Sequence, residues 1–319
     1  MFTVSTIDSL GMMIIRLKDM NSSTVAAILP GCGGILHEFI VIHEGEELDL
    51  IDGYLDEADF KKNVATGGFK GCKLSPFACR INNARFSFGE QDYTPEKFLL
   101  NGNALHGLLY DCAFEVVESF SDEEKATVLL QYSYRGTEKG YPFHYDCEVC
   151  YTLREKNSLT VATIIINRDK GLIPMQDGWH PYFSFGQQID DLELEFQSDK
   201  LVELDAGLIP TGKLIPYREF NSIKRIGDTF FDHCFTLNFD TCQPLCVLRD
   251  RAIGLQLEIS PDKTYPYLQI YTPTHRKSIA IENLSAAPDT FNNGMGLITL
   301  SAGERKTFVT NFKISPIRK

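Results

Sequence analysis

Short runs of alternating apolar and polar residues recur along this chain, and they restrict its fold more than any other feature. Residues 191–196 place Leu192, Leu194 and Phe196 on one face, and residues 254–260 show the same alternation. A period of two residues is typical of strands that bury one face. Glycines and prolines separate these runs, so we expect many short strands joined by turns.

Two further patterns support an all-β chain. Residues 143–153 and 159–167 flank a polar turn and predict a long hairpin, while residues 127–134 and 307–314 are rich in strand-forming types. Long helical periodicity is scarce, and residues 56–62 form the best short helix candidate. The sequence therefore predicts a large antiparallel β-sandwich with few short helices, built as one domain over residues 1–319 from two packed sheets.

Composition narrows the classes of function. Of the 319 residues, 43% are apolar, which is enough for a sizeable core, and the net charge of −12 argues against nucleic acid or anionic membranes as partners. No run approaches the ~18 apolar residues of a membrane span, and the first ten residues lack a secretory leader pattern. The nine cysteines are an odd number and are scattered, which favours reduced thiols and a cytoplasmic protein.

Several patterns that could indicate other chemistry lack the residues which that chemistry requires. Cys147 and Cys150 lie three apart in a predicted strand, where their side chains point to opposite faces and cannot easily share a metal. Residues 30–34 are glycine-rich, but they lack the Lys-Ser/Thr of a phosphate loop and are interpreted as a turn. No Gly-x-Ser-x-Gly motif of an esterase is present. We expect most of the following to be ordinary surface or half-buried residues: His37, His43, His144, His233 and His275.

Two histidines and a glutamate remain as candidates for chemistry. His106 precedes Gly107, His180 lies between Trp179 and Pro181, and Glu282 follows an apolar run near the end of the chain. Imidazoles titrate near neutral pH and a carboxylate is a ready base, so this set can move protons in both directions. The pattern indicates acid/base chemistry on a small neutral molecule, and no metal pattern or nucleotide loop competes with it.

The order of motifs from about residue 25 to the C-terminus resembles the aldose 1-epimerase (galactose mutarotase) family, and its bacterial branch in particular. Each motif alone is weak, but the ordered set is specific. It comprises residues 76–81, 103–107, 178–183, 231–235, 268–272, 281–283 and 287–294. The resemblance implies the family's galactose mutarotase-like supersandwich, an open face that holds a sugar, and interconversion of the α and β anomers of a free aldose. Galactose or glucose is the expected substrate, no cofactor is implied, and monomer and homodimer both stay open.

By resemblance, Glu282 is the base that takes the proton from the C1 hydroxyl, and His180 is the acid that protonates the ring oxygen. His106 is expected to bind near that oxygen. A neighbouring carboxylate is expected to raise the pKa of His180 modestly and keep the imidazole protonated. The rate is then expected to fall at low pH as Glu282 protonates and at high pH as His180 loses its proton.

The resemblance also assigns sugar-binding roles to Arg80, Asp232 and Gln269. Arg80 offers a planar donor fork for neighbouring hydroxyls, Asp232 accepts from hydroxyls, and Gln269 can do either. An aromatic residue, Tyr182 or Phe183, is expected to line the apolar face of the sugar.

Departures from the family pattern leave more than one function open. Cys79 stands where family members often carry Asn before the binding arginine, which puts the hydroxyl contacts there in doubt. Relatives that act on hexose 6-phosphates tend to carry Arg after the His-Gly motif, whereas residues 108–110 here supply no cation, which favours a free sugar. A phosphate-binding cation could still come from elsewhere in the chain. A non-catalytic sugar-binding protein and a glycoside hydrolase or lyase also stay open, although a hydrolase usually needs two carboxylates.

Overall fold

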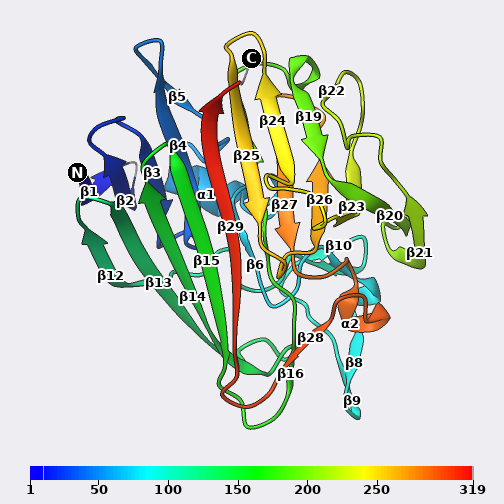
Figure 1. The fold of residues 1–319 in the computed structure, drawn as a ribbon. Helices are drawn as coiled ribbons and strands as arrows, with labels where there is room; N and C mark the ends of the chain where they lie inside the picture. The colour runs from blue at the N-terminus through cyan, green and yellow to red at the C-terminus, as the bar shows by residue number, and fades with distance from the viewer. Residues whose placement is uncertain (10, 318–319) are drawn as a thin grey trace.

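Two layers of antiparallel strands face each other across the molecule (Figure 1). The computed structural model describes residues 1–9 and 11–317, so Leu10 of the N-terminal segment and the last two residues of the range 1–319 lie outside it. Neighbouring strands of the two largest sheets run antiparallel, as the sequence predicts. The predicted fold class, a large antiparallel β-sandwich with few short helices, is confirmed.

One layer is a nine-stranded sheet. Alternation builds it: along β13, Ala126, Val128 and Leu130 are buried, while the residues between them are only partly covered. Its strands, in spatial order, are β12 (Glu115–Ser121), β13 (Lys125–Arg135), β14 (His144–Arg154), β15 (Ser158–Asn167), β29 (Arg305–Pro316), β25 (Leu255–Pro261), β24 (Cys246–Asp250), β19 (Glu193–Phe196) and β22 (Lys224–Arg225).

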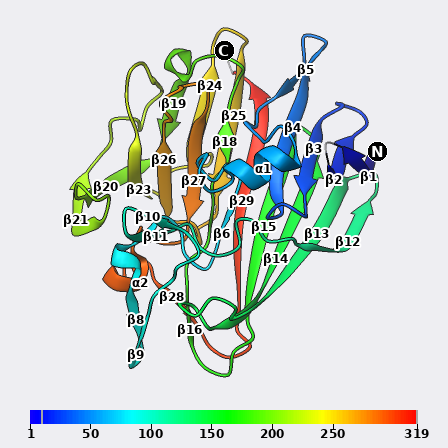
Figure 2. The same cartoon turned by 180° about the vertical axis from the view of Figure 1, so that it is seen from behind.

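Part of the opposite layer is a sheet that carries most of the candidate site residues. Its strands, in order, are β21 (Pro210–Pro216), β20 (Ser198–Leu204), β23 (Asp232–Leu237), β26 (Tyr267–Tyr271), β27 (Ile279–Leu284), β17 (Gly178–Trp179) and β6 (Lys73–Leu74), and β18 (Tyr182–Phe183) also pairs with β27. Figure 2 shows β23, β26 and β27 on the near side, with the nine-stranded sheet behind them.

The N-terminal strands complete this second layer, and β1 and β2 contact β12, β13 and β14. Their sheet contains β1 (Phe2–Ser9), β2 (Met12–Asp19), β3 (Val25–Leu29), β4 (Ile35–His43) and β5 (Glu46–Asp49). Smaller sheets pair β10 (Leu99–Leu100), β11 (Asn103–Leu105) and β7 (Arg80–Ile81); β8 (Phe86–Phe88) and β9 (Gln91–Tyr93); and β16 (Ile173–Met175) and β28 (Ile298–Leu300).

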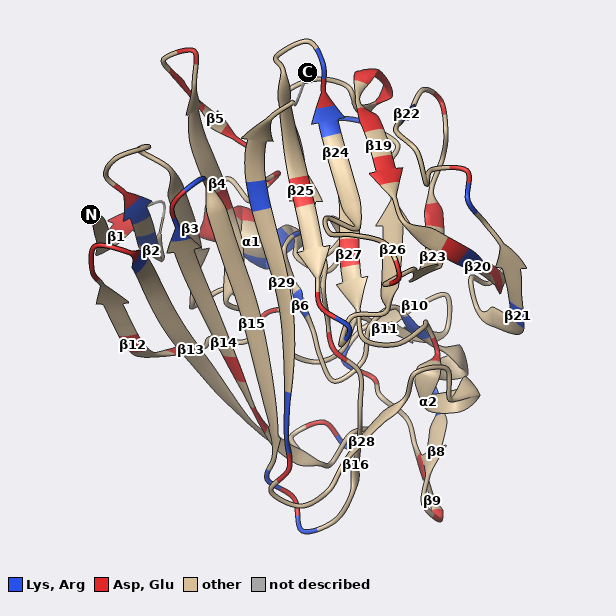
Figure 3. Cartoon of the chain, viewed as in Figure 1, with Lys and Arg blue, Asp and Glu red and all other residues tan. Residues whose placement is uncertain are grey.

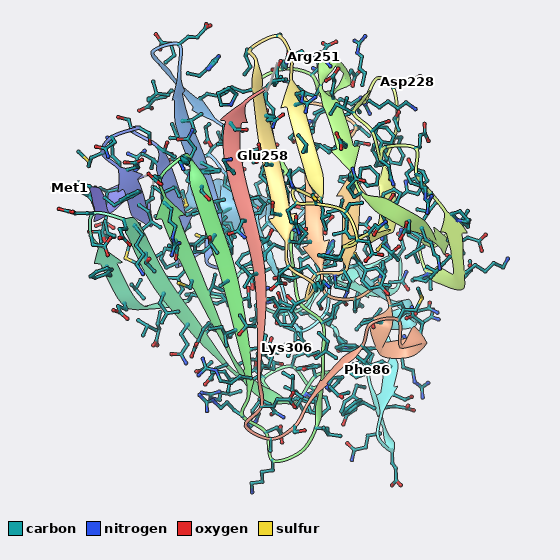
Figure 4. The ribbon with its side chains drawn as sticks, viewed as in Figure 1. Met1, Phe86, Asp228, Arg251, Glu258 and Lys306 are labelled. Carbon is teal, nitrogen blue, oxygen red and sulfur yellow. The ribbon has the colours of Figure 1, made fainter. Side chains whose placement is uncertain are left out.

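Aromatic side chains join the layers. The ring of Trp179 lies 6.1 Å from that of Tyr151, and the ring of Phe183 lies 5.6 Å from that of Phe312. In Figure 3 the strands are mostly free of charged residues, which concentrate at loops and strand ends. Glu258, on the middle of β25, is a charged residue within a strand (Figure 4). The core therefore lies between the sheets, and most charged groups lie around its edges.

Local predictions are confirmed at several places. The predicted hairpin is β14 and β15, which pair from Tyr145 opposite Asn167 to Arg154 opposite Ser158. The predicted helix is α1 (Glu57–Asn63), whose N-cap Asp56 accepts from the backbone N–H of Asp59 at 2.7 Å. A second helix, α2 (Thr290–Asn293), is a single turn. Neither helix in the described ranges is long and apolar enough to cross a membrane.

The motifs that lacked the residues for other chemistry have structural roles. Cys147 is buried in the core and Cys150 is partly exposed, and all nine cysteines are free thiols. Residues 30–34 form a turn. Of the five other histidines, His37 is buried and the other four are exposed or partly exposed, as expected for most of them. Within residues 1–9 and 11–317, no group of three or more Cys, His, Asp or Glu side chains could hold a metal ion.

Candidate active site

His106 lies in a tight turn after β11. Its φ of 58° and the φ of 77° at Gly107 are both left-handed. A Cβ on residue 107 would lie 2.4 Å from the carbonyl oxygen of Ser75, so only glycine fits there. The backbone N–H of Cys79 donates to Nδ1 of His106 at 3.2 Å. That nitrogen is therefore the acceptor, and Nε2 carries the proton as a donor.

His180 and Glu282 come from neighbouring strands of the second layer. His180 lies between β17 and β18, Glu282 lies on β27, and both of these short strands pair with β27. The Nε2 of His180 is 3.4 Å from Oε1 of Glu282, and both side chains are almost fully buried. The imidazole of His180 stacks on Tyr182 with 5.0 Å between ring centroids, and it lies 5.0 Å from the ring of His106. The three candidates for proton transfer are thus brought together.

The candidate binding residues lie beside this pair. Gln269 on β26 lies opposite Glu282 on β27. Asp232 on β23 lies diagonally across from Gln269, on the same face of the sheet. The Nε2 of Gln269 donates to Oδ1 of Asp232 at 3.1 Å. Arg80 is the first residue of β7, where it lies opposite Leu105 of β11, and it is partly exposed.

A single cavity of about 400 Å³ collects all six predicted site residues. Its lining combines one cation and two carboxylates with an apolar wall, the composition expected of a small-molecule site. The other side chains that line it include Phe69, Cys79, Phe98, Leu105, Tyr182 and Tyr271. Tyr182, rather than Phe183, therefore lines the site, because Phe183 points into the core against Phe312.

Three buried polar atoms of the cavity have no hydrogen-bond partner among the described residues: Nδ1 of His180, Oε1 of Gln269 and Oε2 of Glu282. Buried polar atoms are almost always satisfied, because an unpaired one costs about 1–3 kcal/mol. Three of the ten such atoms in the described residues thus belong to residues that line one cavity, where a polar ligand can pair with them.

The electrostatics of the cavity differ from the expectation. Burial lowers the pKa of His180 to about 3, so the predicted upward shift is wrong. Burial raises the pKa of Glu282 well above its usual value; the charge of Asp232 adds to the rise and that of Arg80 opposes it. The physical reason is the loss of water around both groups, which penalises each charged form. Burial therefore favours the neutral carboxylic acid at Glu282 and the neutral imidazole at His180.

The neighbouring groups follow the same rule. The pKa of His106 falls well below its usual value through burial, with the charges of His180 and Arg80 adding to the fall. Burial raises the pKa of Asp232, against the opposing charges of Arg80 and His233 and the hydrogen bond from Gln269. His106 is consequently a neutral hydrogen-bond donor rather than a cation.

Sequence reasoning did not find Phe69 and Tyr271. Tyr271 lies two residues after Gln269 on β26, so strand alternation could have placed it on the same face. Phe69 lies in a loop and packs its ring 4.7 Å from that of His106, a contact that no local pattern indicates.

Comparison with known proteins is consistent with this geometry. The sequence model described as aldose 1-epimerase matches residues 14–313 of the chain. The chain belongs to the aldose 1-epimerase family. The resemblance of the ordered motifs is thereby confirmed over nearly the whole chain.

Among its relatives is an aldose 1-epimerase of Streptococcus thermophilus, 24% identical, with 97% of this chain and 96% of the relative covered. A maltose epimerase of Levilactobacillus brevis is 27% identical over 72% of each chain. A galactose mutarotase-like protein from Clostridium acetobutylicum has the same fold, with a TM-score of 0.87, 19% identity and 99% of both chains covered. The galactose 1-epimerase of Lactobacillus acidophilus has a TM-score of 0.82 at 19% identity, with full coverage of both chains.

Proposed function

We propose that this family member is an active aldose 1-epimerase, which interconverts the α and β anomers of a free aldohexose by opening and reclosing the sugar ring. The observation that carries the proposal is the buried pair of His180 and Glu282, 3.4 Å apart in a cavity whose polar atoms lack partners among the described residues. A protein that only binds sugar has no need of a base and an acid in contact with each other.

Ring opening requires two proton transfers, and the pair holds the single proton needed for both. When a sugar enters, the proton moves from Glu282 to His180 and leaves a carboxylate beside an imidazolium. The carboxylate then takes the proton of the C1 hydroxyl as the imidazolium gives its proton to the ring oxygen O5. The C1–O5 bond breaks, and rotation about C1–C2 presents the other carbonyl face for the reverse steps.

The pKa directions favour this sequence. After ring opening, Glu282 is again a neutral acid and His180 a neutral imidazole, which is the state that burial stabilises. The charged pair exists only with the closed sugar, so opening the ring removes two buried charges. Positioned acid/base groups of this kind contribute roughly 10²–10⁴ in rate.

The remaining polar groups bind and orient the sugar in this proposal. His106 offers its Nε2–H to the ring oxygen side, because its Nδ1 is already engaged by Cys79. Asp232 and Gln269 accept from and donate to neighbouring hydroxyls, and their mutual hydrogen bond fixes both orientations. Arg80 adds a permanent cationic donor at the rim.

The charge of the lining supports a neutral substrate over a phosphorylated one. Arg80 is the one Lys or Arg side chain that lines the cavity within the described ranges, and it accompanies two carboxylates, Asp232 and Glu282. The charge of Arg80 is already opposed by that of Asp232, and burial favours the neutral form of Glu282, so a phosphate would meet no net positive charge there. We also propose a cytoplasmic role in carbohydrate metabolism, supported by nine free thiols, which suit a reducing compartment.

Polarimetry tests the proposal. Fresh α-D-galactose, α-D-glucose and maltose are dissolved with and without protein, and with the Glu282→Gln variant. Faster equilibration by the wild-type protein, lost in the variant, is the expected result. A sugar that binds without faster equilibration would contradict the proposal and favour a binding protein. Release of reducing ends from an oligosaccharide would instead favour a hydrolase, for which Asp232 supplies a second carboxylate in the cavity.

A further inference from the structure

A fully buried ion pair adjoins His180 in the chain but lies outside the cavity lining. Lys73 on β6 and Asp177 have no exposed side-chain surface, and Nζ lies 2.6 Å from Oδ1. The same Nζ donates to the carbonyl oxygen of Gly178 at 3.0 Å and lies 4.6 Å from the ring centroid of Trp179. The hydroxyl of Tyr265 donates to Oδ2 of Asp177 at 2.7 Å. Each of these contacts is made to residues 177–179, immediately before His180.

The segment 177–180 lies between the strand of Lys73 and the strand of Glu282. Gly178 pairs with Leu74 of β6 on one side and with Leu284 of β27 on the other. On the β27 side, Ser285 receives a hydrogen bond from the N–H of Asp177 at 2.8 Å and returns one from its own N–H to the carbonyl oxygen of Asp177 at 2.9 Å. The ion pair thus joins the segment that carries His180 to β6, while the Ser285 hydrogen bonds and the Gly178–Leu284 pairing join it to the strand that carries Glu282.

Stability alone does not account for this pair. Two buried charges lose their hydration, and an apolar pair of similar volume is often equally or more stable. What an ion pair with added hydrogen bonds supplies, and apolar packing does not, is a defined direction and distance. The direction matters here because the 3.4 Å contact between His180 and Glu282 depends on the segment's position.

We propose that Lys73, Asp177 and Tyr265 are positioning residues for proton transfer. They hold residues 177–180 in register, and thereby keep Nε2 of His180 facing Glu282. All three lie outside the lining of the cavity. The kinetic part of this inference rests on the proposed epimerase function.

The first test replaces all three polar groups together, in the variant K73M/D177L/Y265F. Because no buried charge of the cluster is left unpaired, this variant is expected to fold with a melting temperature near that of the wild type. We expect kcat to fall by roughly 10- to 100-fold with KM little changed, since small misplacements of reacting groups have effects of this size. An unchanged kcat in the folded variant would overturn the proposal.

A milder variant keeps the proposal testable if the triple variant does not fold. Tyr265→Phe removes one hydrogen bond and leaves the ion pair in place, so it is expected to fold and to lose a few-fold in kcat. Asp146→Asn is the matched control, because Asp146 is also buried and is paired with Arg135 and Arg168 but does not line the cavity. This control is expected to lose stability while keeping kcat.

A readout that does not need turnover separates this inference from the epimerase proposal. The imidazole ¹⁵N signals of His180, assigned through His180→Asn, report its protonated nitrogen and its titration in the free protein. The emission of Trp179, the only tryptophan, reports the same segment. Both are expected to change in Tyr265→Phe. If kcat falls while both signals stay as in the wild type, positioning is not the cause and the proposal fails. If the wild type shows no epimerase activity, the ¹⁵N and tryptophan signals still test whether Tyr265 positions residues 177–180.

Discussion

Two glutamates on opposite layers of the sandwich, Glu258 and Glu282, have pKa values that are shifted in opposite directions. On the outer side of the nine-stranded sheet, Glu258 accepts hydrogen bonds from Ser315 at 2.6 Å and Gln256 at 2.9 Å, and Lys313 lies 3.6 Å away. In the cavity, Oε1 of Glu282 lies 3.4 Å from Nε2 of His180, and its Oε2 has no partner among the described residues. Glu258 is partly exposed whereas Glu282 is almost fully buried, so burial is one difference between them.

The hydrogen-bond partners are a second difference. Burial alone would raise the pKa of Glu258, but the hydrogen bonds from Ser315 and Gln256 and the charge of Lys313 outweigh it, and the pKa is lowered. At Glu282, no hydrogen-bond donor from the described part of the chain offsets burial, and the pKa is raised. A carboxylate with satisfied lone pairs is a structural group, whereas an unsatisfied one with a raised pKa is available for chemistry.

The largest expected effect on kcat comes from replacing Glu282, the carboxyl group beside His180 in the cavity. Glu282→Gln keeps the size of the side chain and removes the base, so kcat should fall by roughly 10²–10⁴ while sugar affinity changes little. Polarimetry measures the first quantity and titration calorimetry the second. Loss of binding at an unchanged turnover number would contradict the assignment of Glu282 as the base.

The dependence of kcat/KM on pH tests the pKa shifts of His180 and Glu282. The pair is active with one proton, so activity should fall below about pH 3, where His180 gains a second proton, and above the raised pKa of Glu282, where the last proton leaves. This assigns the acid limb to His180 and the alkaline limb to Glu282, the reverse of the sequence expectation. The measurement is kcat/KM of the free protein from about pH 2 to about pH 10, with pre-incubation controls for unfolding. An acid limb near the ordinary pKa of a glutamate, about 4.3, would contradict the structure.

The turn that holds His106 provides a third test. Gly107→Ala places a Cβ against the Ser75 carbonyl at a left-handed φ, so we expect a loss of about 1–3 kcal/mol in the free energy of unfolding. Urea unfolding measures this loss. Gly45→Ala is a control with a similar φ of 89° and no atom within 4 Å of the added Cβ. Equal losses in the two variants would show that backbone strain, rather than the close contact with Ser75, destabilises Gly107→Ala.

The smallest effect is expected at the structural carboxylate. Glu258→Gln on the nine-stranded sheet should leave kcat unchanged and lower the free energy of unfolding by about 1 kcal/mol or less, because partly exposed ion pairs contribute little. Kinetics and urea unfolding on the same preparation check both values. A large fall in kcat in Glu258→Gln would contradict the distinction between a structural Glu258 and a catalytic Glu282.

Local sequence predicted the elements well where one pattern decides the outcome. The alternation at residues 254–260 is strand β25, and the polar turn at 154–158 joins β14 to β15. Asp56, at the start of the predicted helix, is the N-cap of α1 rather than its first residue. These features depend on neighbours a few residues apart, which the sequence displays directly.

The candidate site depended on more than local pattern. The ordered motifs singled out six residues, and the cavity brings all six together from separate segments of the chain. Their sequence does not show that water is excluded from His180 and Glu282, and the predicted pKa of His180 was therefore wrong. Phe69 was missed for the same reason, because its contact with His106 exists only after the chain has folded.

The sequence by itself determined the strands, the family and the identity of the groups that can transfer protons, because side-chain chemistry and local periodicity are written residue by residue. Only the tertiary structure decided that burial raises the pKa of Glu282 and lowers that of His180, and that Lys73 and Asp177 form an ion pair with no exposed side-chain surface. Those properties arise from desolvation and from contacts between strands that are distant in the chain, and neither exists before the two layers pack together.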